Sequence, residues 1–251
     1  MDGQLRFNGK VALITGGSEG IGAALMRAMV ENGASVVAVA RNSQRLSEAA
    51  EGVSLAHRER VKLVSADVRD EEQVQAVITE TLAAYGKIDF LLNCAGVSMR
   101  EPTSVEEIHP TEWNRIMETN LNGTFYFCRG VLPSMKARDE GYIINILSTA
   151  AYRVGKGNSL YSASKFGARA LTEALMEEHR NTGVRISSVS PGPVNTNIWS
   201  HKSRHVSDEE RARMLEPSDI VRIVMFLLTN EPYVHIDNIT VTPWGRQPTK
   251  H

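Results

Sequence analysis

Cysteine is scarce in this sequence: Cys94 and Cys128 are its only two among 251 residues. Their spacing fits no metal-binding motif, and we expect two free thiols inside the fold of a cytoplasmic protein. His201 and His205 are four residues apart, as two metal ligands on one helix face would be, but no third ligand accompanies them. The sequence therefore predicts no metal site.

An excess of either charge is also missing. Lys and Arg number 28 against 29 Asp and Glu, and the net charge is -1. A nucleic-acid surface usually needs a basic excess, so none is expected. No apolar run approaches the roughly 18 residues that a membrane span requires. The opening residues MDGQLRFNGK lack the apolar core of a signal peptide. We expect a soluble, intracellular protein with no nucleic-acid or membrane partner.

What is present is an alternation of short β-branched runs with longer helical stretches. The runs at 10–15, 35–40, 61–66, 89–95, 142–148, 184–190 and 238–243 are predicted strands. Helices are predicted near 20–32, 42–57, 70–85, 111–137, 160–182 and 217–230. Continuously apolar strands alternating with helices are typical of a doubly wound parallel sheet covered on both faces. We predict a single α/β domain over 1–251, with a substrate lid at about 193–216.

The first predicted strand runs directly into TGGSEGIG, and a helix follows. Gly16, Gly20 and Gly22 lie in a G-x-x-x-G-x-G arrangement. Glycines let the backbone approach a pyrophosphate closely, and a helix N-terminus offers it free N–H groups. A glycine-rich turn alone can be an ordinary tight turn. Its position between a buried strand and a helix favours a dinucleotide site.

The end of the second predicted strand indicates which dinucleotide. An acidic residue there would bind the ribose of NAD, whereas an arginine would neutralise the 2′-phosphate of NADP. The sequence has Ala40 and then Arg41, with Arg45 one turn on. NADP(H) is therefore preferred over NAD(H). Glu19, inside the glycine turn, argues in the other direction because a carboxylate repels phosphate.

Six motifs in order resemble the short-chain dehydrogenase/reductase family. They are TGGSEGIG, NCAG (93–96), Asn120 in METNLNG, Ser148 in NILSTAA, YSASK (161–165) and PGPVNT (191–196). Ser148 precedes Tyr161 by the thirteen residues usual in that family. The resemblance covers about residues 8–245. It implies a Rossmann-type fold and the NAD(P)-dependent interconversion of a carbonyl and an alcohol.

Four residues carry the catalytic expectation: Asn120, Ser148, Tyr161 and Lys165. A tyrosine is a poor base at its ordinary pKa of about 10, but a nearby cation favours the phenolate. Lys165 stands one helical turn after Tyr161, so its charge is expected to lower the Tyr161 pKa. By resemblance, Tyr161 is the general acid or base and Lys165 also binds the nicotinamide ribose. Ser148 would orient the substrate oxygen, and Asn120 would hold a water.

The resemblance also assigns the remaining cofactor-binding positions. Besides the three glycines and Arg41, they are Ser18, Ile21, Asp67, Val68, Asn93, Ala95, Gly96, Pro191, Gly192, Val194 and Thr196. Asp67 would contact the adenine, Asn93 would line the adenosine ribose, and Thr196 would fix the carboxamide. Candidate walls of the substrate pocket are Val97, Ser98, Met99, Tyr152, Arg153, Val154, Ile198 and Trp199.

Substrate and assembly are less defined. The C-terminal VHIDNITVTPWGRQPTKH departs from the family's common ending, and resembles a branch acting on small polar alcohols, amino acids or antibiotics. Lys202 and Arg204, with the two lid histidines, either favour an anionic substrate or are ordinary surface charge. We expect a small-molecule substrate and a homodimer or homotetramer through the helices at 111–137 and 160–182. Two rival functions are a catalytically silent dinucleotide sensor and an epimerase or dehydratase with resident NAD.

Overall fold

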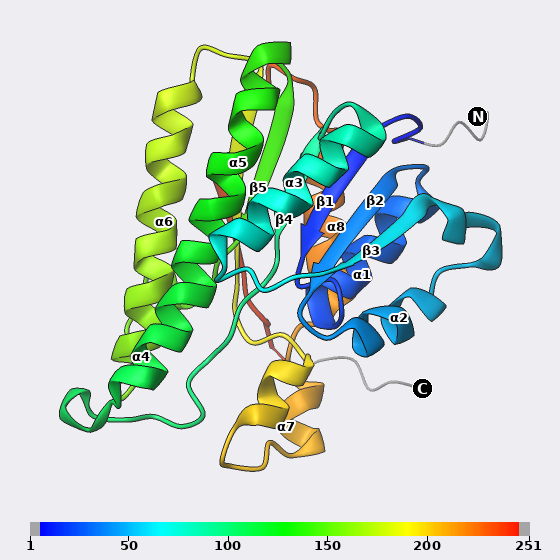
Figure 1. The fold of residues 1–251 in the computed structure, drawn as a ribbon. Helices are drawn as coiled ribbons and strands as arrows, with labels where there is room; N and C mark the ends of the chain where they lie inside the picture. The colour runs from blue at the N-terminus through cyan, green and yellow to red at the C-terminus, as the bar shows by residue number, and fades with distance from the viewer. Residues whose placement is uncertain (1–5, 246–251) are drawn as a thin grey trace.

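The computed structural model describes residues 6–245, in which all seven predicted strands form one parallel sheet (Figure 1). The strand order is β3-β2-β1-β4-β5-β6-β7. The strands are β1 (Val11–Thr15), β2 (Ser35–Ala40), β3 (Val61–Ser65), β4 (Phe90–Asn93), β5 (Gly141–Ile146), β6 (Val184–Pro191) and β7 (Asn238–Val241). The order reverses between β1 and β4, which confirms the predicted Rossmann-type, doubly wound sheet.

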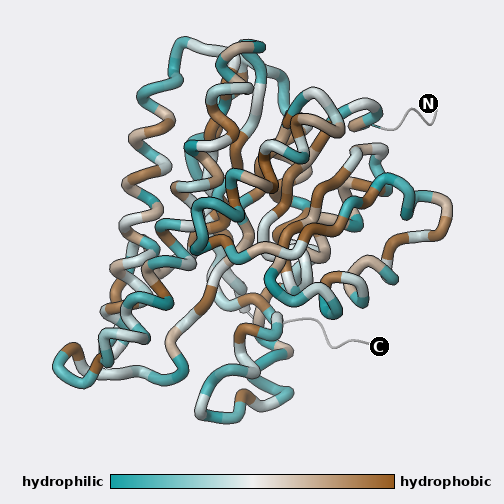
Figure 2. The backbone as a smooth tube through the Cα atoms, in the orientation of Figure 1, coloured by the Kyte–Doolittle hydropathy of each residue, from teal (hydrophilic) through white to brown (hydrophobic). Residues whose placement is uncertain are grey.

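Helices cover both faces of this sheet. They are α1 (Gly20–Glu31), α2 (Ser43–Glu51), α3 (Glu71–Tyr85), α4 (Pro110–Met117), α5 (Gly123–Arg138), α6 (Ser159–His179), α7 (Asp208–Ala212) and α8 (Pro217–Thr229). One hydrophobic cluster joins the sheet to α1, α2 and α8, and a second joins it to α3, α5 and α6. The apolar strands lie between these layers (Figure 2).

Local signals explain where several helices begin and end. The Asp70 carboxylate accepts hydrogen bonds from the backbone N–H groups of Glu72 and Gln73, which caps α3. That helix ends at Gly86, whose φ of 74° is the left-handed conformation that glycine adopts most easily. Pro217 begins α8, with a capping box between Glu216 and Asp219.

Two predicted helices differ from the structure. The helix expected at 42–57 ends at Glu51, before Gly52, and a separate 3₁₀ helix, η1 (Leu55–Arg60), follows. The helix expected at 111–137 is divided by a π-helical segment, η3 (Glu118–Asn122), between α4 and α5. The side chain of Asn120 in η3 is hydrogen bonded to both Val97 and Ser164. These hydrogen bonds to distant residues accompany the π-helical turn. The hydrophobic periodicity of the sequence carries no information about them, so it predicts an uninterrupted α-helix.

The stretch at 193–216 is more ordered than a plain loop. It contains a 3₁₀ helix, η5 (Asn197–His201), as well as α7. An isolated parallel bridge pairs Val194 with Leu215, both of which pack in the first hydrophobic cluster, and Val206 within the stretch is buried. The lid therefore has its own apolar attachment to the rest of the protein. Two further 3₁₀ turns are η2 (Val105–Glu107) and η4 (Thr149–Ala151).

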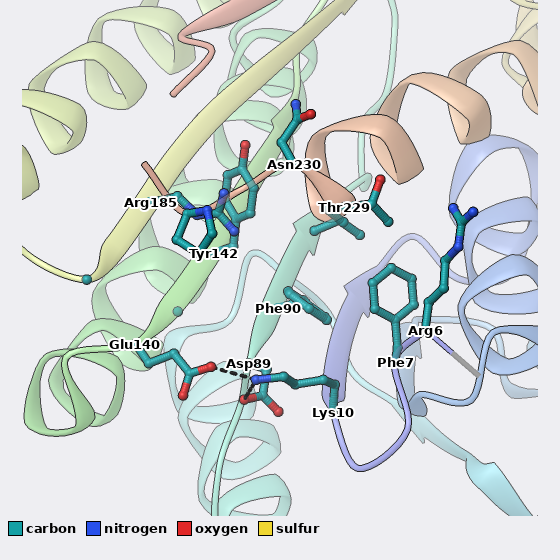
Figure 3. Close-up of a pocket in the computed structure, with 14 residues that line it drawn as sticks. Arg6, Phe7, Lys10, Asp89, Phe90, Glu140, Tyr142, Arg185, Thr229 and Asn230 are labelled. Carbon is teal, nitrogen blue, oxygen red and sulfur yellow. Dashed lines mark hydrogen bonds and ion pairs between the residues drawn. The ribbon is translucent and has the colours of Figure 1, made fainter. Parts of the chain in front are cut away.

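A cavity of about 660 Å³ lies at the amino ends of the strands (Figure 3). Its wall includes Asp89, a buried carboxylate that accepts a hydrogen bond from the Val11 N–H. Lys10, Lys87 and Arg138 form ion pairs with this carboxylate. None of the predicted site residues lies here, and the cations fix the sheet's amino edge. Among residues 6–245, no helix is long and apolar enough to cross a bilayer.

Candidate active site

A cavity of about 930 Å³ lies at the carboxyl ends of the central strands. This is the edge where ligands bind in doubly wound sheets, beside the reversal of strand order. Most of the predicted site residues line it: Gly16, Ser18, Gly20, Ile21, Gly22, Arg41, Val68, Ala95, Gly96, Ser148, Tyr161, Lys165, Pro191, Gly192, Val194 and Thr196. Asp67, Asn93 and Asn120 are the predicted residues that do not.

The glycine turn is packed too tightly for side chains. Gly16 has a φ of 69°, and a Cβ there would lie 2.9 Å from the backbone nitrogen of Ala95. A Cβ on Gly22 would lie 2.2 Å from the Gly16 carbonyl oxygen. Real Cβ atoms do not approach that closely, so these positions require glycine. The turn therefore brings bare backbone to the mouth of the cavity.

The N-terminus of α1 faces this cavity, and no side chain among residues 6–245 caps its free N–H groups. Glu19 precedes the helix, but its side chain makes no capping hydrogen bond, and the first turn holds no acidic residue. Nearby, the Thr15 hydroxyl accepts hydrogen bonds from the N–H groups of Cys94 and Ala95, both at 3.1 Å. These bonds hold the ends of β1 and β4 together. Free N–H groups and bare glycine backbone fit the pyrophosphate of a dinucleotide.

Two arginines lie at the end of β2, where a protein of this fold distinguishes the 2′-phosphate of NADP from the 2′-hydroxyl of NAD. Arg41 and Arg45 both line the cavity and are exposed, and Arg45 lies 3.8 Å from the Glu19 carboxylate. Ala40 ends β2 and brings no carboxylate. Glu19 therefore neutralises part of the charge on Arg45, while Arg41 forms no ion pair among the described residues. Arg41 is the better placed cation for a phosphate.

Tyr161 and Lys165 lie on one face of α6, as their spacing predicts. The Lys165 ammonium is 5.9 Å from the centroid of the Tyr161 ring. It donates a hydrogen bond of 3.1 Å to the Ile146 carbonyl at the end of β5. Lys165 is buried, and this bond holds its charge beside the phenol. Residues from β5 and α6 thus meet at the cavity wall.

The pKa values of this pair differ from the sequence-based expectation. Burial raises the pKa of Tyr161 above its ordinary value, and the interaction with the Ser148 side chain offsets only part of the rise. Burial lowers the pKa of Lys165 to about 8. The expectation that Lys165 would lower the Tyr161 pKa is therefore not what these contacts produce, because desolvation of the phenolate dominates.

Ser148 lies where β5 leads into η4, beside Tyr161. Its hydroxyl oxygen accepts a hydrogen bond of 3.1 Å from the Ala150 N–H, which fixes the side chain. The hydroxyl hydrogen can still be donated to another oxygen. Ser148 also moderates the rise in the Tyr161 pKa, and both side chains line the cavity. A carbonyl oxygen between them would be held by two donors.

Asn120 lies behind the cavity wall instead of lining it. Its side-chain oxygen accepts from the Val97 N–H at 2.8 Å, and its side-chain nitrogen donates to the Val97 carbonyl and the Ser164 hydroxyl. The amide therefore joins the chain after β4 to α6. Both N–H groups of its carboxamide and one of the two acceptor sites of its oxygen are bonded to protein, so its role in the structure is to position the wall.

Asn93 and Asp67 also lie outside the cavity lining. The Asn93 amide is buried and donates to the Asn145 side-chain oxygen at 2.9 Å, which joins β4 to β5. The Asp67 carboxylate is held by the Arg69 guanidinium, and this pairing lowers the Asp67 pKa. The Asn93 side chain therefore points into the protein, and the predicted position of this residue beside the adenosine ribose stays a prediction. Strand position alone could not tell which face Asn93 occupies.

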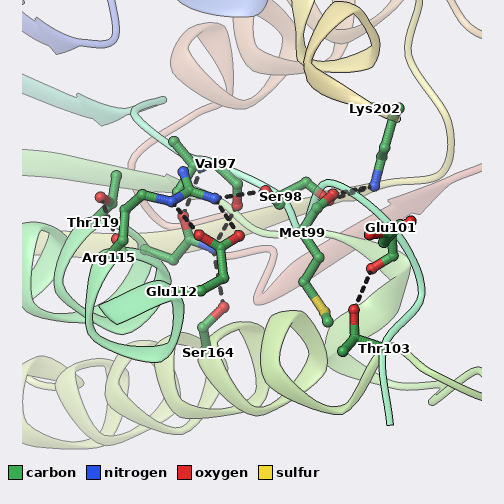
Figure 4. Close-up of polar contacts among 11 residues, drawn as sticks. Val97, Ser98, Met99, Glu101, Thr103, Glu112, Arg115, Thr119, Ser164 and Lys202 are labelled. Carbon is green, nitrogen blue, oxygen red and sulfur yellow. Dashed lines mark hydrogen bonds and ion pairs between the residues drawn. The ribbon is translucent and has the colours of Figure 1, made fainter. Parts of the chain in front are cut away.

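The structure adds residues that sequence reasoning missed. Arg115 and Thr119, on the α4–η3 path, line the cavity beside the predicted wall residues Val97, Ser98, Ile198 and Trp199. Arg115 is paired with Glu112 and donates to the Ser98 carbonyl (Figure 4). No motif marks an arginine five residues before Asn120. Met99, Tyr152, Arg153 and Val154, also candidate walls, are not part of the lining.

The lid reaches the cavity from both sides. At one end, the Asn197 side chain donates a hydrogen bond to the Glu19 carboxylate in the glycine turn. At the other, the Lys202 ammonium donates to the Ser98 hydroxyl and the Met99 carbonyl. Glu19, which argued against a phosphate site, thus also serves as an anchor for the lid. Within residues 6–245, no group of three or more His, Cys, Asp or Glu residues could hold a metal.

Comparisons with known proteins agree with this geometry. A family model described as short chain dehydrogenase matches residues 10–207. An uncharacterised oxidoreductase of Staphylococcus aureus (strain USA300) is 34% identical over 234 residues, which are 93% of this chain and 97% of that protein.

Two solved structures share the fold. A metagenomic short-chain oxidoreductase in complex with NADP has a TM-score of 0.80 and 30% identity, with 96% of this chain and 100% of that chain covered. The closed form of a serine dehydrogenase complexed with NADP+ has a TM-score of 0.80 and 26% identity, with 92% and 93% covered. The chain belongs to the short-chain dehydrogenase family and is an NAD(P)-dependent oxidoreductase.

Proposed function

We propose that this enzyme interconverts a carbonyl and a secondary alcohol on a small-molecule substrate, with NADP(H) as the cofactor and Tyr161 as the general acid or base. The observation that carries the proposal is the meeting of Ser148, Tyr161 and Lys165 on the wall of the cavity that the glycine turn opens into. Proton transfer and dinucleotide binding then share one site.

The residues divide the chemistry between them. When bound, the reduced nicotinamide supplies a hydride to the carbonyl carbon and is oxidised as the carbonyl becomes an alcohol. Tyr161 donates its phenolic proton to the oxygen, and Ser148 donates a hydrogen bond to the same oxygen. Lys165 stabilises the resulting phenolate. Pro191, Gly192, Val194 and Thr196, which line the cavity at the end of β6, would cover the nicotinamide.

The raised pKa of Tyr161 favours the reductive direction. A phenol that burial keeps protonated is ready to donate a proton, whereas alcohol oxidation needs the phenolate. A bound oxidised nicotinamide would bring a positive charge toward the ring and so favour the phenolate. The same site can therefore serve both directions. Carbonyl reduction uses Tyr161 in the protonated form that the free enzyme already holds, whereas alcohol oxidation first requires its deprotonation.

Support for NADP(H) over NAD(H) comes from the arginines after β2. Arg41 and Arg45 are cationic and exposed, no carboxylate ends the strand, and the two structural neighbours described above are NADP complexes. A 2′-phosphate beside Arg41 would gain a charge-assisted hydrogen bond. Asp67 and Val68, next along the sheet edge at β3, would flank the adenine.

We expect the rate of carbonyl reduction to fall as pH rises through about 8. Burial lowers the pKa of Lys165 from 10.5 to about 8, so the ammonium is present below that pH and lost above it. A neutral amine no longer stabilises the Tyr161 phenolate that forms during turnover. The measurement is kcat/KM for reduction across neutral to alkaline pH. A profile that stays flat through pH 8 would contradict this role.

The same shift has a consequence for stability. Because the Lys165 pKa is lower in the folded protein than in the unfolded chain, the unfolded chain binds more protons between about pH 8 and 10.5. The Lys165 contribution to the free energy of unfolding therefore rises with pH across that window, while activity falls. Opposite trends in activity and stability distinguish titration of Lys165 from alkaline unfolding.

A homodimer or homotetramer through α5 and α6 is part of the proposal. Phe125 on α5 and Phe166 on α6 are each exposed by about two fifths, and they offer apolar contacts to a second copy at these helices. We expect sedimentation equilibrium of the intact chain to return a multiple of 27.7 kDa. A mass equal to one chain would show that these faces remain open.

The free thiols Cys94 and Cys128 support a reducing, cytoplasmic compartment.

A cofactor-consumption screen tests the function directly. NADPH or NADH is mixed with the enzyme and a panel of aldehydes, ketones, keto acids, β-ketoacyl thioesters and steroids, and the loss of reduced-nicotinamide absorbance is followed. Turnover of a carbonyl substrate, with the alcohol as product, is the expected result. Tight binding of NADPH with no turnover across the panel would instead indicate a silent dinucleotide sensor.

A further inference from the structure

The lid presents one cation to the cavity without a counter-charge. Lys202 follows η5, lines the cavity and is partly buried. Among the described residues, no carboxylate lies within ion-pair distance of its ammonium, and burial lowers its pKa. Taking an ammonium out of water without a partner is costly. The other lid arginines differ. Arg204 and Arg213 are exposed and paired with glutamates of α7, and Arg211, outside the cavity lining, donates to the Asn195 side chain.

Neutral groups hold this ammonium in place. It donates to the Met99 carbonyl at 2.6 Å and to the Ser98 hydroxyl at 3.0 Å (Figure 4). It also lies 5.7 Å from the ring centroid of Trp199, whose indole N–H is fixed by the Val194 carbonyl. An ammonium has three N–H donors, and the two hydrogen bonds use two of them. One donor and the full positive charge remain for a ligand.

The position of Lys202 relates it to the reacting carbonyl. Met99, which accepts one of its hydrogen bonds, packs in the same small hydrophobic cluster as Val97 and Tyr161. Ser98, which accepts the other, lines the cavity. The ammonium is therefore attached to the wall segment that contacts the catalytic tyrosine. It is separate from Arg41, which lies at the end of β2.

The other charged side chains that line the cavity do not cancel the positive charge of Lys202. Arg115 also lines the cavity, but Glu112 neutralises it through two hydrogen bonds. Arg100 is exposed, lines the cavity and forms no ion pair within 4 Å among residues 6–245. Glu19, the acidic residue in the lining, stands at the glycine turn and is engaged by Arg45 and Asn197. An anionic group would meet Lys202 without a competing carboxylate, and Arg100, whose charge interacts with the Glu112 carboxylate, would add a second positive charge.

We propose that the substrate carries a carboxylate that Lys202 binds, so that the enzyme acts on a keto acid and the corresponding hydroxy acid. This inference rests on the proposed carbonyl–alcohol chemistry and names the substrate class of the same site. The carboxylate supplies the counter-charge that the lid lacks, and its capture holds the carbonyl toward Tyr161 and Ser148. A neutral substrate would leave the Lys202 charge uncompensated.

Matched pairs of substrates test the proposal. The kcat/KM for NADPH-dependent reduction is measured for pyruvate and acetoacetate and for their methyl esters, which carry one more methyl group and lack the negative charge. The wild-type enzyme should prefer the acids. Lys202→Met should reduce the acid-to-ester ratio by about 10- to 100-fold, the loss expected for a charge-assisted hydrogen bond. Lys202→Arg should restore part of the ratio, and Arg204→Gln, on the exposed side of the lid, should leave it unchanged.

The outcomes separate this inference from the function on which it rests. Reduction of neutral ketones or esters with no preference for acids would overturn the carboxylate site and leave the proposed function standing. If Lys202→Met raises the KM for NADPH and leaves the acid-to-ester ratio unchanged, the cation serves a cofactor phosphate and the inference fails. If no panel member turns over, calorimetry of the NADP+ complex with lactate and lactamide decides: selective binding of lactate supports the carboxylate site, and its absence refutes it.

Discussion

Tyr161→Phe should lower the rate of carbonyl reduction by about 10²- to 10⁴-fold, the usual contribution of a positioned general acid. The change removes one oxygen from a side chain whose ring packs with Met99, Ile116 and Leu160. The ring contacts remain, so the fold and the cofactor site should be preserved. The measurement is kcat with saturating NADPH, together with the dissociation constant for NADPH from fluorescence titration.

Tyr126→Phe is the matched control. Tyr126 loses the same atom but lies on α5, outside the cavity lining. Its rate should equal that of the wild type. If Tyr161→Phe also keeps near wild-type turnover, the proton comes from elsewhere and the proposed mechanism is wrong. If NADPH binding falls together with the rate, Tyr161 acts in cofactor binding and not only in proton transfer.

Arg41→Ala should weaken NADPH binding by about 10- to 100-fold, because one charge-assisted hydrogen bond to a phosphate is lost. Binding of NADH, which has no 2′-phosphate, should change little. Arg41 forms no ion pair among the described residues and is exposed, so its removal leaves no buried charge unpaired. Dissociation constants for both cofactors, measured in one buffer of stated salt concentration, provide the comparison.

Arg180→Ala controls for the loss of one positive charge. Arg180 is exposed at the end of α6, where it pairs with Glu177. It should affect neither cofactor. An equal loss of NADPH and NADH affinity in Arg41→Ala would show that Arg41 supports the site in general. No loss of either would assign the 2′-phosphate contact to another residue, with Arg45 the nearest candidate.

The first two strands were predictable because their residues are apolar almost without interruption. VALIT and SVVAVA can be stable only in the middle of a sheet that helices cover on both sides, and both are almost fully buried. The glycine turn was predictable for a related reason. Gly16 and Gly22 occupy places where a Cβ would collide with backbone, and such places admit one residue type.

Side-chain direction at the strand ends was not predictable. Asn93 ends β4 beside the cavity, yet its amide turns toward Asn145 in the neighbouring strand. The π-helical turn at Asn120 depends on hydrogen bonds to Val97 and Ser164, residues far away in the sequence. The directions in which the pKa values of Tyr161 and Lys165 shift were not predictable either. The spacing of Tyr161 and Lys165 indicates a charge beside a phenol, but burial decides both pKa values.

The sequence by itself determined the order of strands and helices, the glycine turn and the position of Tyr161 one helical turn before Lys165, because backbone sterics and helical periodicity act between neighbours in the chain. Only the tertiary structure decided that Lys202 reaches Ser98 and Met99, about a hundred residues away, and that no carboxylate accompanies it there. Burial and charge balance arise from segments that meet in space, and the spacing of residues along the chain does not encode them.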